Sequence, residues 1–268
     1  MSFNLAAYAD RIGYSDPLEP SFETLRGLAK HHVSSVPFEN LNVLLGLPIE
    51  LTASALENKL VGQRRGGYCF EQNGLMLGVL EQIGFEVRPL SGRVRIDLPR
   101  EITPPRTHLF ILVTLDGEEW IFDVGVGGMS LTSPIRFRVD EEQATLHEAR
   151  RIVHHDGRYF HQAWMGKDWA DVYEFTGETM PVVDREVGNW WTSTNPTSKF
   201  ANNLFAARAA EDGVRVGLFN DRLTWRRGPE VLEQRVLGSA EEVVEVLAGE
   251  FGLMVPDGAA VERLYRRS

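Results

Sequence analysis

Three side chains that together could perform nucleophilic catalysis stand far apart in the sequence: Cys69, His108 and Asp123. A thiolate attacks a carbonyl carbon and a thiol does not, so a nucleophilic cysteine needs a base to take its proton. A third group must then orient that base, and histidine followed by aspartate commonly fills the two roles. Cys69 is the sole cysteine of the chain. It therefore forms no internal disulfide, and its thiol is free for such chemistry.

Cys69 stands where a helix is expected to begin. Gly66 and Gly67 precede it, and apolar residues at helical spacing follow it up to Ile83, before Gly84. The partial positive charge at a helix N-terminus stabilises a thiolate. A lone cysteine is more often a small buried hydrophobe, so its partners decide between the two interpretations.

His108 lies in a predicted strand, 107–113, that is apolar on both faces. A buried imidazole without a hydrogen-bonding partner costs about 1–3 kcal/mol, so His108 needs a polar neighbour. A purely structural role for such a histidine also satisfies this need. The histidines expected to be solvated, because they occupy polar stretches, are His147, His154, His155 and His161.

Asp123 is the candidate partner of His108. The sequence Asp116-Gly117 is typical of a two-residue turn, which predicts that the strands on either side pair antiparallel. In that register Asp123 lies opposite Phe110, which shares a strand face with His108. The two polar residues are then diagonal neighbours, about 7–8 Å apart between backbones and within side-chain reach. A three-residue loop would place them on opposite faces.

A cluster of glycines directly follows the second strand, in Val124-Gly125-Val126-Gly127-Gly128. The backbone amides of such a loop can face a phosphate or pyrophosphate. The spacing differs from the dinucleotide-binding fingerprint, and no helical pattern follows. Taken alone, the cluster is also typical of a tight turn.

The composition is that of a globular protein, with 43% hydrophobic and 25% charged residues. A formal net charge of -10 argues against nucleic acid or an anionic membrane as a partner. No run approaches the roughly 18 apolar residues of a membrane span, and no secretory signal pattern opens the chain. We therefore expect a cytoplasmic protein.

The periodicity changes from helical to strand-like near residue 85. Before it, helical patterns begin at Asn4, Ser21, Thr52 and Cys69. After it, strands are expected at 86–96, 107–115, 119–124, 135–139 and 150–155. A turn-rich connection is expected at 189–196, followed by two strands, 204–209 and 214–219, and a helix that begins at Ser239 and ends before Pro256.

The residues described above resemble those of the arylamine N-acetyltransferases. The segment Arg64-Arg65-Gly66-Gly67-Tyr68-Cys69-Phe70-Glu71-Gln72-Asn73 is the most specific match. The other matching segments follow the family's order over most of the chain, at 36–41, 107–108, 122–125 and 195–200.

The resemblance implies an α+β fold with a papain-like cysteine-transferase core. The units it implies are an N-terminal helical bundle carrying the cysteine (1–84), a central β-barrel carrying the histidine and aspartate (85–187), an interdomain connection (188–203) and a C-terminal α/β lid (204–268). Cys69, His108 and Asp123 match the family's catalytic triad.

The implied reaction moves an acetyl group from acetyl-CoA to the nitrogen of an arylamine, arylhydrazine or N-hydroxyarylamine. An acetyl-cysteine links the two half-reactions, and no metal takes part. Thr107 and the loop residues Gly125, Val126, Gly127 and Gly128 would border CoA. Phe38, Val126 and Phe200 would line the acceptor pocket, where Val126 replaces an aromatic residue common in the family and leaves room for a wider ring.

Other functions fit the same three residues. A cysteine hydrolase or a transglutaminase uses cysteine, histidine and aspartate in this order, although the Arg-Gly-Gly-Tyr-Cys motif and the loop glycines argue against both. An amide synthase of the same family, acting on a polyketide chain, is a nearer alternative. A catalytically silent CoA-binding module is another, if His108 and Asp123 only satisfy each other. The physiological amine and the oligomeric state stay open.

Overall fold

The computed structural model describes residues 3–210, 212–256 and 260–266. The helices are α1 (Leu5–Ile12), α2 (Phe22–Ser35), α3 (Leu41–Leu45), α4 (Ala53–Leu56), α5 (Cys69–Ile83), α6 (Val182–Thr194), α7 (Lys199–Asn202) and α8 (Ala240–Phe251). The strands are β1 (Phe38–Glu39), β2 (Glu86–Val94), β3 (His108–Leu115), β4 (Glu118–Phe122), β5 (Ile135–Arg136), β6 (Arg150–His155), β7 (Arg158–Trp164), β8 (Trp169–Thr179), β9 (Phe205–Ala209), β10 (Val214–Phe219), β11 (Arg222–Arg227) and β12 (Glu230–Val236).

Helices dominate the N-terminal part, and their ends follow the predicted caps. The side chains of Asn4, Ser21 and Thr52 accept hydrogen bonds from backbone amides at the starts of α1, α2 and α4. Helix α5 has the predicted bounds and ends at Gly84 in a left-handed conformation. Beyond α4 the chain continues as a π-helical turn, η1 (Glu57–Gly62).

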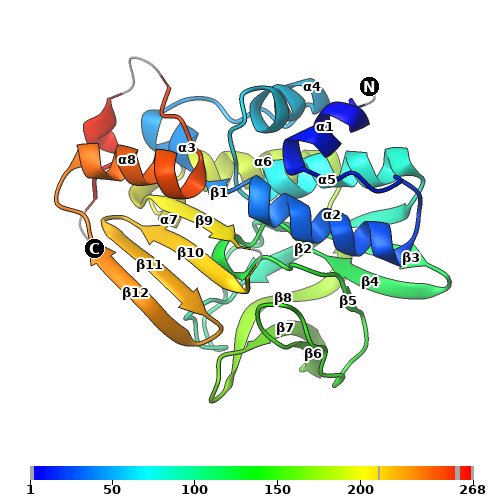
Figure 1. Ribbon diagram of the computed structural model, residues 1–268. Helices are drawn as coiled ribbons and strands as arrows, with labels where there is room; N and C mark the ends of the chain where they lie inside the picture. The colour runs from blue at the N-terminus through cyan, green and yellow to red at the C-terminus, as the bar shows by residue number, and fades with distance from the viewer. Residues whose placement is uncertain (1–2, 211, 257–259, 267–268) are drawn as a thin grey trace.

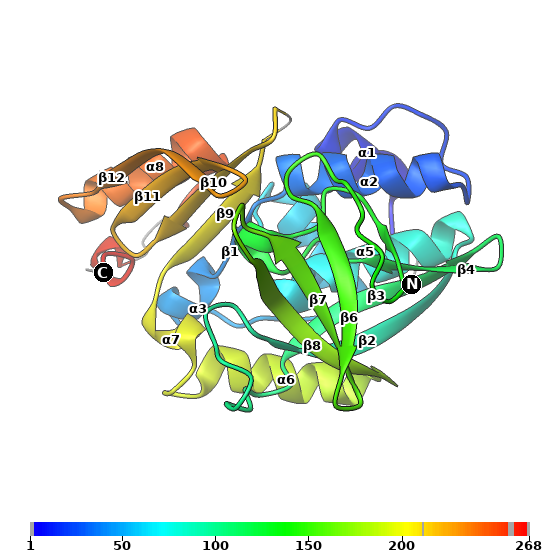
Figure 2. The same cartoon turned by 90° about the horizontal axis from the view of Figure 1, so that it is seen from below.

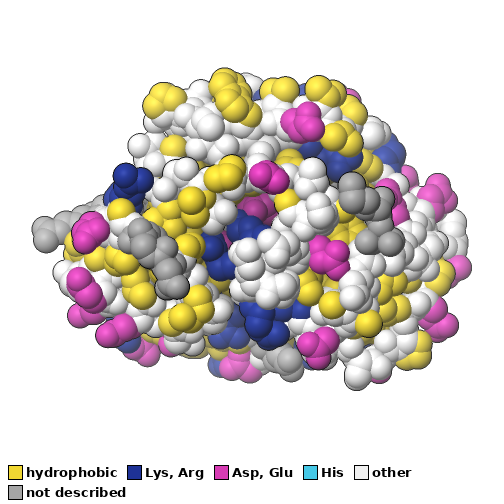
Figure 3. All heavy atoms as spheres, turned by 90° about the horizontal axis from the view of Figure 1, so that it is seen from above, with side chains coloured by type: hydrophobic (Ala, Val, Ile, Leu, Met, Phe, Trp, Pro, Cys, Tyr) yellow, Lys and Arg dark blue, Asp and Glu magenta, His cyan; other side chains and the backbone are white. Residues whose placement is uncertain are grey.

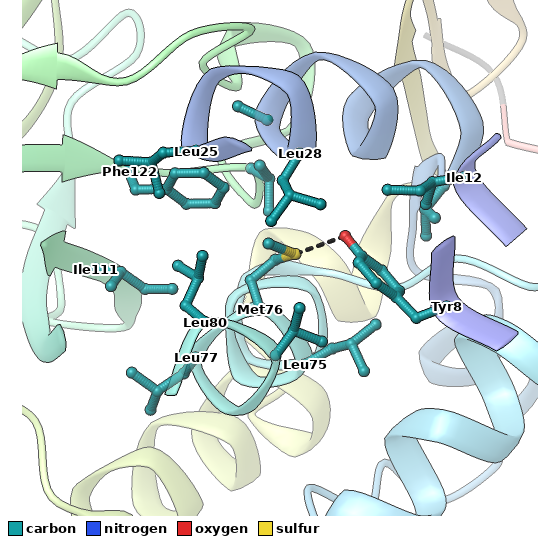
Figure 4. Close-up of a cluster of buried hydrophobic side chains, with 14 of the residues drawn as sticks. Tyr8, Ile12, Leu25, Leu28, Leu75, Met76, Leu77, Leu80, Ile111 and Phe122 are labelled. Carbon is teal, nitrogen blue, oxygen red and sulfur yellow. Dashed lines mark hydrogen bonds between the residues drawn. The ribbon is translucent and has the colours of Figure 1, made fainter. Parts of the chain in front are cut away.

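Helix α5 is the centre of the first hydrophobic core (Figure 4). Its side chains Met76 and Leu80 meet those of α2 on one side, and Ile111 of β3 also joins the cluster. The hydroxyl of Tyr8 from α1 donates to the sulfur of Met76 at 2.8 Å. This core fixes α5 against β3, and the two elements carry the candidate cysteine and histidine at their first residues.

The central sheet has seven strands in the order β5-β4-β3-β2-β8-β7-β6, paired antiparallel. It curls on itself beneath the helices (Figures 1 and 2), and two isolated bridges join the segment after β5 to β6. Strand β3 is buried on both faces, as predicted: Phe110 and Leu112 pack inside the barrel, and Ile111 and Val113 pack against the helices. The fold is the predicted α+β class.

The second sheet has five strands in the order β1-β9-β10-β11-β12, and α8 packs beside it (Figure 1). Its first strand comes from the N-terminal part of the chain, where Phe38 pairs with Ala207. The lid sheet, as we call these five strands, is therefore joined through β1 to the segment that precedes Cys69. Backbone pairing also links Phe38 directly to Gly67.

Two sequence expectations for the last third of the chain were wrong. The predicted turn-rich connection at 189–196 is largely helical, because α6 continues to Thr194. Trp190 lies on the surface of this helix and is 64% exposed. Four strands, and not two, lie between α7 and α8. Tight turns at Asn220-Asp221 and Gly228-Pro229 allow the additional hairpins, and β12 was missed because every one of its residues is exposed and shows no buried face.

The surface is mixed in charge. On the face seen from above, Lys and Arg side chains gather in a central hollow, while Asp and Glu lie mostly towards the margins (Figure 3). An acidic protein can thus present local positive charge. Within the described residues, no helix is both long and apolar enough to cross a membrane.

Candidate active site

Cys69 is the first residue of α5, at the position that the glycine pair predicted. Gly66 lies so close to the chain before β1 that an added Cβ would stand 1.9 Å from the Pro37 carbonyl oxygen, so a side chain is impossible there. Glu71 Oε2 accepts from the Tyr68 amide at 3.1 Å and fixes the turn into the helix. Cys69 is 7% exposed, and its thiol donates to the Thr107 carbonyl at 3.5 Å.

His108 and Asp123 meet as the hairpin register predicted. Ile111 lies opposite Phe122 and Leu115 opposite Glu118. Asp123 follows the last residue of β4, and its Oδ2 lies 2.8 Å from His108 Nε2. Both side chains are buried. Because Nε2 is bound to the carboxylate, Nδ1 is the ring nitrogen left for the thiol.

The electrostatics favour an imidazolium at His108. Burial by itself would lower the pKa of His108, but the Asp123 carboxylate and a hydrogen bond with Cys69 raise it well above its ordinary value. Burial would likewise raise the pKa of Asp123, yet the His108 charge and three hydrogen bonds hold it below its ordinary value. A charged His108 stabilises a neighbouring thiolate, so the three groups can store the nucleophile as an ion pair.

Asn73 is part of this arrangement and was not singled out in the sequence. Its Nδ2 donates to Asp123 Oδ1 at 2.8 Å and to the Leu109 carbonyl at 2.7 Å, while its Oδ1 accepts from the Val124 amide at 3.1 Å. It lies one helical turn after Cys69, on the same face of α5. That spacing, for an amide on the buried side of a helix, was the signal that could have identified it.

The predicted glycine loop lies directly against the triad. The Gly125 amide donates to Asp123 Oδ1 at 3.0 Å, so this amide is engaged within the triad. A Cβ on Gly125 would stand 2.9 Å from the Cys69 Cα, which explains the glycine by close approach. Gly127 has φ of 70° and packs against the Phe38 ring, and Gly128 follows it in a short 3-10 turn.

The predicted acceptor pocket is brought together only in part. Phe38 and Phe200 have ring centroids 6.0 Å apart, and both belong to the cluster that contains Cys69 and Tyr68. The side chain of Val126 belongs instead to the core inside the barrel. Position 126 therefore contributes to the packing beneath the loop in this structure.

The expectation of solvated histidines was wrong for His161 and holds only in part for His147, which is half-buried, with Nδ1 3.2 Å from Thr132 Oγ1 and Nε2 3.0 Å from the Ala210 carbonyl oxygen. His161, expected to be solvated, is fully buried, and its ring lies 4.8 Å from that of Tyr173. Tyr173 in turn lies 4.9 Å from His108, so these rings form the packed floor beneath the triad. The polar residues near His161 in the sequence suggested an exposed position, although its side chain lies inside the barrel. Among the residues that the structure describes, no group of His, Cys, Asp or Glu could hold a metal ion.

Alkylation of Cys69 by iodoacetamide is expected to proceed at a nearly constant rate between about pH 6 and pH 8. The raised pKa of His108 keeps its ring charged as the pH rises through the ordinary histidine range, and the charge is lost only at higher pH. The rate of an unpaired thiol would rise about tenfold per pH unit over the same range. Without the imidazolium, His108→Gln should react about 30-fold more slowly at pH 7.

A surface histidine supplies the matched control. His155 Nε2 lies 3.2 Å from Asp156 Oδ2, and both side chains are exposed. His155→Gln should therefore leave the alkylation profile unchanged. A wild-type rate that climbs tenfold per pH unit would contradict the ion pair.

Comparisons with known proteins agree over nearly the whole chain. The family profile described as N-acetyltransferase matches residues 21–260. The arylamine N-acetyltransferase of Mycobacterium tuberculosis is 40% identical over 261 residues, covering 96% of this chain and 92% of that protein. The arylamine N-acetyltransferase / N-hydroxyarylamine O-acetyltransferase of Salmonella typhimurium is 38% identical over 258 residues, covering 96% and 91%. The structure of Mycobacterium marinum arylamine N-acetyltransferase in complex with CoA matches with a TM-score of 0.92 and 40% identity, and 97% of each chain is covered.

Proposed function

The chain belongs to the arylamine N-acetyltransferase family and is an acyltransferase, and on this premise we propose that it works by a ping-pong mechanism through an acetyl-Cys69 intermediate. The acceptors are the nitrogens of arylamines, arylhydrazines or N-hydroxyarylamines, and acetyl-CoA is the donor. The observation that carries the proposal is the buried His108–Asp123 pair, 2.8 Å apart, beside the only cysteine at the start of a helix.

In the first half-reaction, the Cys69 thiolate attacks the thioester carbonyl carbon of acetyl-CoA. The carbon–sulfur bond to CoA breaks, and the CoA thiolate takes the proton that His108 holds. Exchange of one thioester for another is nearly balanced. Backbone amides near Cys69 hold the oxyanion, since the first amides of a helix lack partners within it.

In the second half-reaction, the amine nitrogen attacks the carbonyl carbon of acetyl-Cys69. His108 takes the proton that the nitrogen loses, and Asp123 keeps the ring oriented while it is charged. The bond between the carbonyl carbon and Sγ then breaks and restores the thiolate. His108 thus gives one proton to the departing CoA thiolate and regains another from the amine, so it ends the cycle charged as it began.

The loop and the aromatic cluster supply the proposed substrate contacts. CoA is bordered by Thr107, Gly125, Val126, Gly127 and Gly128, with the amides of Gly127 and Gly128 facing phosphate. The loop also has local positive charge, since Arg226 Nη2 donates to the Gly128 carbonyl at 2.8 Å. Phe38 and Phe200 line the acceptor pocket, and Val126 shapes it from beneath the loop.

The proposed organisation follows the three units and the connection predicted from the sequence. Residues 1–84 carry the nucleophile, residues 85–187 carry His108 and Asp123, and residues 204–268 form the lid. The connection, 188–203, contains the end of α6 together with α7. The cytoplasmic location stays a prediction of the sequence.

Incubation of the protein with acetyl-CoA alone tests the proposal. We expect one acetyl group per chain by intact-protein mass spectrometry, with release of one equivalent of CoA. Addition of an arylamine such as aniline should discharge the adduct and yield the N-acetyl product. Protein alkylated beforehand at its only cysteine should take up no acetyl group. Absence of an adduct in the untreated protein, or an adduct that transfers only to water, would refute the proposed mechanism.

A further inference from the structure

Glu148 is a buried carboxylate surrounded by three arginines, outside the triad. Its side chain is 0% exposed. It accepts from Arg150 Nη2 at 2.9 Å, from Arg215 Nε and Nη2 at 2.8 Å each, and from Arg226 Nη1 at 2.9 Å. A single buried anion thus orients three cations, whose mutual repulsion would be unopposed without it.

The arginines come from two different parts of the fold. Arg150 is the first residue of β6 in the barrel and Glu148 lies just before it, whereas Arg215 is on β10 and Arg226 on β11 of the lid sheet. Buried ion pairs add little net stability, because desolvation offsets their attraction. Their geometric effect is larger, since the bidentate contact between Arg215 and Glu148 fixes the barrel and the lid sheet in one relation.

The same two lid arginines also hold residues 127–130, which comprise the last two glycines of the glycine loop together with Met129 and Ser130. Arg226 Nη2 donates to the Gly128 carbonyl at 2.8 Å, and Arg215 Nη2 donates to the Ser130 carbonyl at 3.0 Å. Each guanidinium therefore binds Glu148 and a loop carbonyl at once. The loop starts at the triad and returns to it, because the Leu131 amide donates to the Asp123 carbonyl at 2.7 Å.

The third arginine points back towards the floor of the active site. Arg150 Nη1 lies 3.5 Å from His161 Nε2, and the His161 ring packs on Tyr173. Burial and the Arg150 charge lower the pKa of His161, so this ring stays neutral. Glu148 is accordingly connected to the floor beneath His108 on one side and to the glycine loop on the other.

We propose that Glu148 is a positioning residue for the donor: through Arg215 and Arg226 it holds loop 127–130 in the shape that receives CoA. A loop rich in glycine loses much conformational entropy when it becomes ordered. Because the arginines already hold its carbonyls in place, less of this entropy is lost when CoA binds. The inference rests on the proposed function in one respect only, namely that this loop borders CoA.

Glu148→Gln tests the proposal, because it removes the charge and keeps the size of the side chain. We expect the Kd for CoA, measured by calorimetry, to rise about 10–100-fold, as when a supporting charged partner is lost from a site. The KM for acetyl-CoA should rise alike, whereas the maximal rate of Cys69 acetylation and the Cys69 alkylation profile should change by less than about threefold. Arg226→Gln, which removes the loop contact from a partly exposed position, should weaken CoA binding in the same sense.

The control is Arg222→Gln on the same lid strand. Arg222 donates to Gln234 at 3.3 Å on the exposed surface, and its removal should leave CoA binding unchanged. Unchanged CoA affinity in both Glu148→Gln and Arg226→Gln would overturn the inference, as would a parallel fall in CoA affinity, alkylation rate and melting temperature. Wild-type protein that binds CoA without forming acetyl-Cys69 would refute the proposed function alone, and the binding comparison would still decide the role of Glu148. Wild-type protein that binds no CoA would overturn both.

Discussion

Cys69→Ala is expected to lose acetyl transfer by about 10⁵-fold or more, the largest effect of any single substitution in the chain. The Cys69 thiol is the proposed nucleophile, and an alanine leaves no atom there to carry the acetyl group. Cys69→Ser should fail nearly as completely, because an imidazolium does not ionise an alcohol. Steady-state rates with a small arylamine, together with intact-protein mass after incubation with acetyl-CoA, measure both variants.

The affinity of these two variants for CoA shows whether they are inactive because the nucleophile is missing or because the fold is disturbed. Both should bind CoA with wild-type affinity, because the contacts of loop 127–130 with Arg215 and Arg226 do not involve Sγ. Alanine is also well tolerated at the first position of a helix, so α5 should form normally. An acetyl adduct on Cys69→Ala would place the acceptor elsewhere and contradict the assignment.

The geometry of the triad followed from short-range signals. Asp116 and Gly117 both adopt positive φ, as a tight two-residue hairpin requires, and the turn fixes the register of β3 against β4. Since side chains alternate along a strand, that register also decides which residues share a face with His108. The start of α5 was equally readable, because glycines before a helical pattern mark a boundary.

Contacts between distant segments could not be predicted in this way. Glu148 and Arg226 stand in unremarkable polar stretches and Arg215 within the predicted strand 214–219, and only the approach of the lid sheet to the barrel joins them. The pairing of β1 with β9 is of the same kind, since a two-residue strand has no periodicity. Local patterns therefore predicted the candidate triad, while the groups that hold loop 127–130 depend on long-range packing.

The position of Val126 shows how the two levels interact. The family resemblance implied that Val126 forms a wall of the acceptor pocket. The left-handed turn at Gly127 and the hydrogen bond from the Gly125 amide to Asp123 instead accompany a Val126 side chain that packs in the barrel core. The width of the acceptor ring that the pocket admits would then depend on Val126 through the support that this side chain gives to the loop.

Asp123→Asn is expected to lower the acetylation rate by about 10³–10⁴-fold, the second of the two large effects. The carboxylate accepts from His108 through Oδ2 and from Asn73 and the Gly125 amide through Oδ1. An asparagine must turn its NH₂ group towards one of these donors. If the NH₂ group faces Asn73 and the Gly125 amide, a donor is placed against donors. If it faces His108, Nε2 must accept a hydrogen bond, so the imidazole adopts the wrong tautomer. Both orientations remove the charge that raises the pKa of His108.

The pH profile distinguishes this mechanism from a general loss of structure. With a lowered His108 pKa, alkylation of Cys69 in Asp123→Asn should be slow near pH 7 and should climb towards that of a free thiol at about pH 9. A merely loosened protein would instead react faster at every pH as the thiol became exposed. Asp156→Asn is the matched control, because Asp156 also lies beside a histidine but on the surface. Solvent screening there leaves the pair with little interaction energy, so this substitution should not change the profile. Acetylation by Asp123→Asn within about tenfold of the wild-type rate would show that His108 does not depend on this carboxylate.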